Sequence, residues 1–367
     1  MANQSVGTPV FYIDYTQLAK AKGFFRNLTD FNTNNTNGIY ELDANGDRIY
    51  GDKNMNVWNF DYAKSTNYIC QNANFFNFRL AFWNPDVSSE YSLEWAKLLQ
   101  TANWGGLINH NIYSQAKNIG ADDIWINFIY WTPNGDLYNY WTEDSGRMIE
   151  YDGFTIFESS VNDDLVFSNL NNYSCLVADV HFGEDTDAAG GELQFDLGAI
   201  AFGRKIEMPN APDIDLTKSV EYDGIKTQRS LGGSDYVQIN NLGCPDWVNG
   251  QPWSLTQSVS KGRIGKNGRR KWELKFSYIS SDNMFFDPTK QSSFGEQNNI
   301  ENPTEFYATN EVQQIFDLTL GGALSFIFQP DKNTEEYAIC RLDQNAFSTT
   351  QVAHNVYSVN MSIVETW

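Results

Sequence analysis

The stretch KGRIGKNGRRKWELKFSY, residues 261–278, carries the pattern that decides the fold class. From residue 271 onward, apolar side chains occupy every second position: Trp272, Leu274, Phe276 and Tyr278. The positions between them are charged: Lys271, Glu273 and Lys275. Alternation with a period of two is typical of a β-strand that buries one face in a core. We therefore expect a strand with core aromatic residues, preceded by a Gly-rich loop.

Strand patterns recur along most of the chain. The final residues, 355–367, alternate small polar positions with an apolar series: Tyr357, Val359, Met361 and Ile363. Residues 122–142 alternate in the same way and turn at PNGD, residues 133–136, which favours a tight hairpin. Short strands separated by Gly and Asn/Asp turns are typical of sandwiches and jelly rolls.

Helical patterns occur in two segments. Residues 14–25 place Leu18, Ala21 and Lys22 at helical spacing, and residues 88–102 carry an apolar face behind a capping serine. The sequence thus predicts a mainly β protein with few short helices. It consists of a jelly-roll-like sandwich followed by a second β-sandwich or barrel domain.

The predicted organisation has four parts. An N-terminal arm with an Asn-rich loop region covers residues 1–59, and the jelly-roll-like domain covers 60–206. Residues 207–216, EMPNAPDIDL, hold two prolines and little periodicity, which indicates a connector. The second β domain covers 217–367 and contains the basic hairpin 261–278.

The chain is acidic, and its charge is unevenly distributed. Its formal net charge is -21, of which residues 1–200 contribute -16 and residues 201–367 contribute -5. Such a field repels polyanions. Four widely spaced cysteines suggest buried reduced thiols, since no CxxC pair is present. The chain has no signal-peptide pattern and no apolar run of membrane-spanning length, so we expect no membrane insertion.

No local motif for catalysis stands out, and we expect neither an enzyme nor a cofactor. The three histidines, His110, His181 and His354, are far apart and outside metal-binding motifs. Acidic pairs such as Asp122–Asp123 invite a glycosidase interpretation, but solvated turn acids explain them better. In DANGDRIYGD, Asp43, Asn45 and Asp47 resemble a calcium loop weakly. A hairpin turn between residues 40 and 50 explains the same residues without a metal.

The basic strip between residues 261 and 275 allows three interpretations. Nucleic-acid binding would pair its cations with phosphates, but the acidic field and the core role of the aromatic residues oppose it. A solvated loop is a second interpretation. We favour docking, in which Arg263, Lys266, Arg269 and Arg270 meet acids of another copy or partner, such as Asp163 and Asp164. No nucleic-acid partner is expected.

Three segments carry a family resemblance. They are WGGLINHNIYSQA at 104–116, residues 197–233 together with 268–285, and the terminus CRLDQNAFSTTQVAHNVYSVNMSIVETW at 340–367. The opening TPVFYIDYTQLAKAKG fits the same group. These segments resemble virion proteins of tailed bacteriophages, of the distal-tail or baseplate-hub kind. The first is similar to a strand-turn of jelly-roll, discoidin-like domains.

The resemblance implies a structural protein of the virion, assembled in the host cytoplasm. It implies two β domains and a homo-oligomeric ring, often of six copies, which joins the tail tube to host-contacting parts. Other virion proteins would be its partners. The alternative is a carbohydrate-binding module for host surface glycans. Its candidate contacts are Trp131, Tyr138, Tyr140 and Trp141, beside the PNGD turn, although strand core explains these aromatic residues better.

Overall fold

The computed structural model describes a large share of the chain. The described residues are 6–22, 25–27, 39–42, 48–50, 65–70, 75–82, 102–120, 124–131, 137–139, 147–158, 175–182, 193–214, 216–222, 225–239, 247, 268–285 and 312–366.

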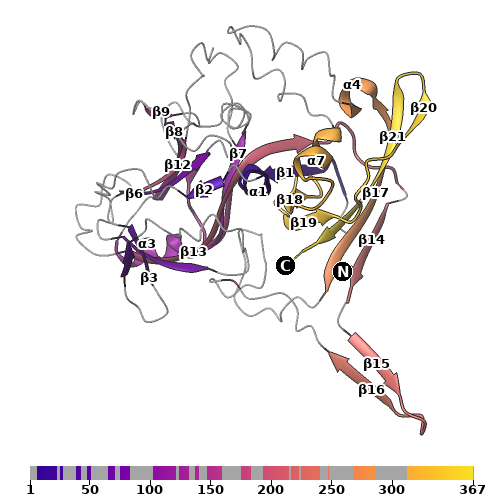
Figure 1. The fold of residues 1–367 in the computed structure, drawn as a ribbon, viewed down its shortest axis with the longest axis horizontal. Helices are drawn as coiled ribbons and strands as arrows, with labels where there is room; N and C mark the ends of the chain where they lie inside the picture. The colour runs from indigo at the N-terminus through magenta and orange to yellow at the C-terminus, as the bar shows by residue number, and fades with distance from the viewer. Residues whose placement is uncertain are drawn as a thin grey trace.

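One antiparallel sheet of 13 strands dominates the molecule, so the predicted mainly β class is confirmed (Figure 1). Its main path in space is β14 (Thr217–Glu221), β17 (Arg269–Ser280), β21 (Val356–Glu365), β19 (Ala338–Leu342), β18 (Phe326–Gln329), β1 (Val10–Asp14), β13 (Leu193–Glu207), β5 (Thr66–Cys70), β3 (Ile39–Leu42) and β4 (Arg48–Tyr50). Off this path, β7 (Trp104–His110) pairs with β13 and with β11 (Gly153–Glu158), and β20 (Thr349–Ala353) pairs with β21.

Two smaller sheets and short helices complete the described fold. The six-stranded sheet contains β10 (Arg147–Met148), β8 (Ile124–Trp131), β12 (Cys175–Phe182), β6 (Phe75–Phe82) and β2 (Phe25–Asn27), with β9 (Leu137–Asn139) beside β8. The third sheet is the hairpin of β15 (Ile225–Arg229) and β16 (Asp235–Ile239). The helices are α1 (Tyr15–Ala21), α3 (Ile112–Asn118), α4 (Ser281–Met284) and α7 (Val312–Leu318). The predicted helix at 88–102 lies outside the described residues, and the jelly-roll arrangement stays a prediction.

Strand β1 lies at the centre of the large sheet and is buried on both faces. Phe11 and Ile13 belong to one core cluster, with Phe328, whereas Val10 and Tyr12 belong to another. This explains the apolar run at the start of VFYID, because a strand that is buried on both faces needs apolar residues at odd and at even positions. Residues 9–14 are therefore part of the core of the protein.

Strand β13 links segments that are distant in the sequence. Over its 15 residues it pairs with β5 near residue 195, with β7 near 200 and with β1 near 205. The large sheet thus runs without a break across the predicted boundaries at 59/60 and 206/207, and β1 also pairs with β18 from the second half. Whether those boundaries separate independent folding units stays a prediction. Of the predicted connector, Glu207 belongs to β13 and residues 208–214 lie outside helices and strands.

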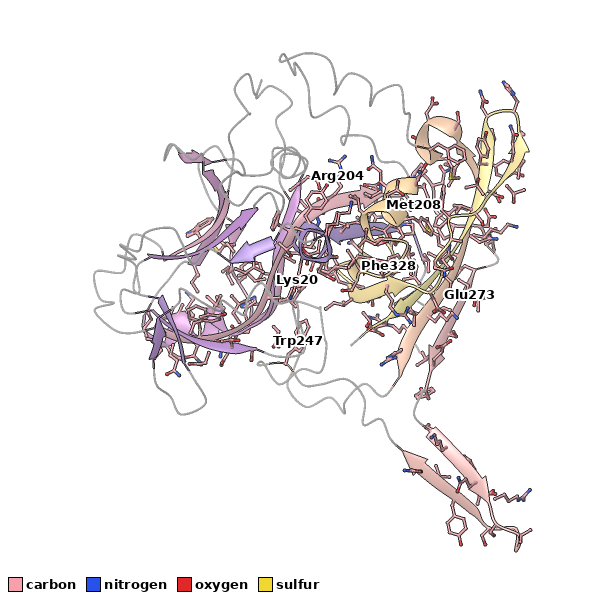
Figure 2. The ribbon with its side chains drawn as sticks, in the orientation of Figure 1. Lys20, Arg204, Met208, Trp247, Glu273 and Phe328 are labelled. Carbon is pink, nitrogen blue, oxygen red and sulfur yellow. The ribbon has the colours of Figure 1, made fainter. Side chains whose placement is uncertain are left out.

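Strand β17 confirms the alternation in its first half and departs from it near its end. Trp272, Leu274 and Phe276 are buried, and Glu273 lies on the outer side of the strand (Figure 2). The predicted burial of Tyr278 is wrong. The register against β21 shifts between Phe276 and Ile279, so that Ile279 takes the buried place. Tyr278 has a positive φ of 62° and its side chain is 76% exposed.

Helix α1 forms where the sequence predicts it, but with a different apolar face. Asp14 caps it, because its carboxylate accepts from the Thr16 amide at 2.9 Å. The buried residues are Tyr15, Thr16, Leu18 and Ala19. Ala21 is exposed and Lys22 is already the C-cap, so the helix ends before its expected face is complete.

Candidate functional site

The hairpin of β15 and β16 projects from the molecule as an arm (Figure 1). We call residues 225–239 the arm. All five residues of β15 are exposed, and so are all five of β14, the edge strand that precedes it. Figure 2 shows the side chains of the arm standing clear of the body. An isolated two-stranded hairpin is at best marginally stable in water, so the arm is an unusual feature to keep unsupported.

The tip of the arm is an ordered turn. The Ser230 amide donates to the carbonyl of Ser234 at 2.8 Å, and the Gly233 amide donates to the carbonyl of Ser230 at 3.0 Å. The Ser234 amide in turn donates to Ser230 Oγ at 3.0 Å. Gly233 has a φ of 86°, which glycine adopts without steric cost. This turn presents Leu231 fully to solvent.

The two faces of the arm differ in polarity. The register sets Thr227 opposite Val237 and Arg229 opposite Asp235, so these residues share one face with Ile225. Ile225 and Val237 are half exposed or more. Arg229 Nε lies 3.4 Å from Asp235 Oδ1 near the tip. The other face carries Lys226, Gln228, Tyr236 and Gln238.

The second half of the basic strip lies in β17. There, Arg270 forms a salt bridge with Glu365 of the same chain. Its Nη2 donates to Glu365 Oε1 at 3.0 Å and its Nε to Glu365 Oε2 at 3.1 Å, a bidentate geometry. The Glu365 side chain is fully buried. The guanidinium also lies 5.2 Å from the ring centre of Trp272. Burial opposes its charge, but the Glu365 carboxylate outweighs burial and the pKa of Arg270 is raised.

The two lysines of the strip that the structure describes, Lys271 and Lys275, are also paired with acids of neighbouring segments. Lys271 Nζ lies 3.0 Å from Asp343 and 3.6 Å from Glu221. The hydrogen bond to Asp343 raises the pKa of Lys271. Lys275 Nζ lies 4.0 Å from Asp213. These lysines balance Glu221 of β14, Asp213 of the connector and Asp343, a role that the sequence does not predict.

The remaining predicted docking residues are placed only in part. Arg269 opens β17 opposite Glu221 of β14. Arg263, Lys266, Asp163 and Asp164 lie outside the described residues.

The glycan candidates are only partly placed. Trp131 ends β8 and Tyr138 lies in β9, and the pairing of these strands forms the predicted hairpin. The register sets Trp131 opposite Leu137 and Tyr138 opposite Tyr130, so the two candidates are not directly opposite each other. Tyr140 and Trp141 lie outside the described residues.

The weak calcium candidate also lies outside the described residues, at Asp43, Asn45 and Asp47. The strands on either side, β3 and β4, pair as a hairpin, with Leu42 opposite Arg48. Within the described ranges, no group of three or more His, Cys, Asp or Glu residues is arranged to hold a metal ion.

His110 is the buried histidine of the large sheet. Its Nε2 lies 3.1 Å from Thr155 Oγ1 on the neighbouring strand β11. Burial lowers the pKa of His110 to about 3, so the ring is neutral at physiological pH. His354 lies in an exposed turn. This geometry makes His110 a core residue of the sheet, with Thr155 as its partner.

Comparison with known proteins adds no family to this picture: no protein-family model, curated protein or solved structure matches the chain. Across the residues that the structure describes, no helix is long and apolar enough to cross a membrane.

Proposed function

We propose that the chain is a structural virion protein of a tailed bacteriophage, of the distal-tail or baseplate kind, whose copies associate into a ring. The observation that carries the proposal is the arm. A single large sheet forms a continuous body, and from its edge strand β14 the chain extends a fully exposed hairpin with apolar residues on it. A surface element of this kind is typical of a protein that completes its fold by contact with a neighbour.

The sequence supports the same class. The segments that resemble tail proteins, residues 197–233 and 268–285, include β15 and most of the turn of the arm, together with β17. The resemblance implies that such chains join the tail tube to host-contacting parts. In this proposal the large sheet supplies a rigid protomer, and surface contacts between protomers supply the ring.

Native mass spectrometry of the full chain tests this proposal. We expect an oligomer with a defined number of copies at low and at moderate salt. Exposed charge pairs are screened by salt, whereas apolar contacts are not weakened by it. An oligomer that persists as salt rises supports apolar contacts such as those of the arm. An oligomer that dissociates as salt rises supports contacts made by the basic residues Arg263 and Lys266. A chain that remains a monomer at every concentration would contradict the proposal.

The second candidate function is recognition of host surface glycans. The β8–β9 hairpin brings Tyr138 opposite Tyr130, next to the turn where the aromatic candidates cluster in sequence. Sugar rings stack on exposed aromatic side chains, so a site there would depend on Trp141. A glycan array checks this function. Binding that is lost in Trp141→Ala supports it, and an array without hits argues against it.

A further inference from the structure

A second exposed apolar site lies at the far end of the ribbon that carries the arm. The ribbon pairs β14 with β17, from Glu221 opposite Arg269 to Thr217 opposite Glu273. The arm follows Glu221 in the chain, and so extends from the Arg269 end. The other end of β17 carries Tyr278, nine residues further on, which corresponds to a distance on the order of 30 Å along the strand.

Ile214 lies at that same far end. It follows Asp213, whose amide donates to the carbonyl of Lys275 at 2.7 Å. The Asp213 carboxylate accepts from Ser277 Oγ at 2.7 Å. These two bonds hold the connector against Lys275 and Ser277 of β17, and Ser277 directly precedes Tyr278 in the chain. Ile214 is fully exposed and Tyr278 is 76% exposed, and we call these two residues the receiving site.

Tyr278 is held outward at a conformational cost. Its φ of 62° lies in the left-handed region, which a large aromatic residue rarely adopts. The register shift after Phe276 turns it outward while Ile279 fills the core. Strained backbone of this kind persists where the surrounding structure enforces it and often marks a contact site.

We propose that the arm of one copy docks on the receiving site of a second copy. The Leu231 tip and the apolar face of Ile225 and Val237 would cover Ile214 and Tyr278. The proposal rests on the self-association of the proposed function and names the surfaces that mediate it. Because the two surfaces differ and lie at opposite ends of the ribbon, each copy gives an arm to one neighbour and receives one from another. Contacts of this heterologous kind generate a closed ring or a filament.

Charge favours a second copy as the occupant. The chain as a whole carries -21, so two copies repel each other over most of their surfaces. The arm is an exception, since its charged residues are Lys226, Arg229 and Asp235, a net charge of +1. At the receiving end, Asp213 and the exposed Asp282 lie on the described segments next to Ile214 and Tyr278, and Lys275 lies 4.0 Å from Asp213, so these three residues carry a net charge of -1. An arm with a small positive charge therefore meets a receiving site with a small negative charge.

Two charge substitutions at exposed positions test the contact in the full chain. Leu231→Glu alters the arm and Ile214→Glu alters the receiving site. Both side chains are fully exposed, so neither substitution disturbs the protomer's core. We expect each to weaken self-association about 30-fold or more, as for the loss of a central interface residue. Tyr151→Glu, at a half-exposed tyrosine of the first half of the chain, is the matched control and should assemble as the wild type does.

Mixing the two variants gives the decisive measurement. In the mixture, the intact arm of the Ile214→Glu chain can dock on the intact receiving site of the Leu231→Glu chain. We expect native mass spectrometry to show a mixed dimer that grows no further, while each variant alone remains monomeric.

Other outcomes would overturn the proposal. If the wild type assembles and the variants assemble equally well, the contact is elsewhere and only the docking proposal fails. If Leu231→Glu is monomeric while Ile214→Glu assembles, or if the mixture of two monomeric variants stays monomeric, the arm does not dock on this site. A wild type that stays monomeric at its highest soluble concentration overturns both this contact and the proposed ring.

Discussion

Strands β1 and β15 have the same length and opposite surroundings. Each has five residues, yet every residue of β1 is buried and every residue of β15 is exposed. Strand β1 pairs with β13 on one side and β18 on the other, whereas β15 pairs with β16 alone. The sequences differ accordingly, VFYID against IKTQR.

This difference separates stability from assembly. The interactions that fix β1 are all internal, so substitutions there should change the free energy of unfolding. The arm has few internal contacts, so substitutions there should leave unfolding nearly unchanged and act on the contact with a neighbour. Three matched pairs of substitutions and one single substitution can break or sharpen this contrast.

The largest effect is expected from glycine to alanine substitutions. A Cβ at Gly203 of β13 would lie 2.0 Å from the carbonyl oxygen of Ile13 in β1, and backbone at the centre of a sheet cannot move away. At Gly232 on the arm, the nearest atom to a Cβ is Ser230 Oγ at 3.8 Å. We expect Gly203→Ala to lower the free energy of unfolding by about 4–5 kcal/mol. Gly232→Ala should change it by less than about 0.5 kcal/mol. Urea unfolding of both variants measures this, and equal midpoints would refute the contrast.

The second pair compares two arginine–carboxylate contacts. Arg270 pairs with a fully buried Glu365, whereas Arg229 and Asp235 on the arm are both more than half exposed. Arg270→Met leaves the buried Glu365 carboxylate without the arginine that balances its charge and should cost about 3 kcal/mol or more. Arg229→Met should cost at most about 0.5 kcal/mol, because exposed ion pairs contribute little.

A double substitution tells the loss of the ion pair apart from the loss of the arginine side chain. In Arg270→Met with Glu365→Leu both charges of the pair are removed, so this variant should unfold at a higher urea concentration than Arg270→Met alone. If it is less stable than Arg270→Met, burial of the carboxylate without its arginine is not the cause of the lost stability.

Arg270→Glu is a poor probe of docking, because it would set two carboxylates together in the protomer and disturb its fold.

The third pair concerns pH and two histidines. In the folded chain burial lowers the pKa of His110 to about 3, below its ordinary value of 6.5. Between these values the unfolded chain binds a proton that the folded chain does not, so stability is present above about pH 6.5 and falls as the pH falls. From about pH 6.5 to about pH 5, His110 alone should remove about 2 kcal/mol.

The variants that isolate this effect are His110→Gln and His354→Gln. The first should reduce the loss between those two pH values by about 2 kcal/mol, whatever its effect on stability at neutral pH. The second, at an exposed turn, should follow the wild type in urea unfolding. Identical pH profiles for the wild type and His110→Gln would show that the ring is not kept neutral by burial.

The strands that are buried on one face were the predictable part of the fold. Alternation alone predicted that Trp272, Leu274 and Phe276 share a buried face and that Val359, Met361 and Ile363 share one face of another strand. The structure buries all six and pairs the two strands, β17 and β21. Two kinds of strand were missed. Strand β1 has apolar residues at odd and at even positions because it lies between two core clusters. A search for alternating apolar residues does not find such a strand.

The arm was missed for the opposite reason. Few of its residues are apolar, so it lacks the signal of a core strand, although the turn SLGGS between IKTQR and DYVQI is a hairpin pattern with glycines. Nor did the sequence reveal that Arg270 and Lys271 bind acids of the same chain. Glu365 is 95 residues from Arg270, and only the order of strands in the sheet brings the two together.

Among the substitutions that are expected to change stability measurably, the one at Tyr278 has the smallest effect and separates stability from assembly most sharply. Asparagine adopts the left-handed conformation more readily than tyrosine does, so Tyr278→Asn should raise the free energy of unfolding by about 0.5–1 kcal/mol. Its side chain is smaller and polar, so the same substitution should weaken self-association if Tyr278 receives the arm. Stability and assembly would then change in opposite directions at one residue. Urea unfolding and native mass spectrometry of one preparation measure both. A variant that is less stable than the wild type shows that Tyr278 supports the fold, and that its outward conformation is not a cost kept for contact.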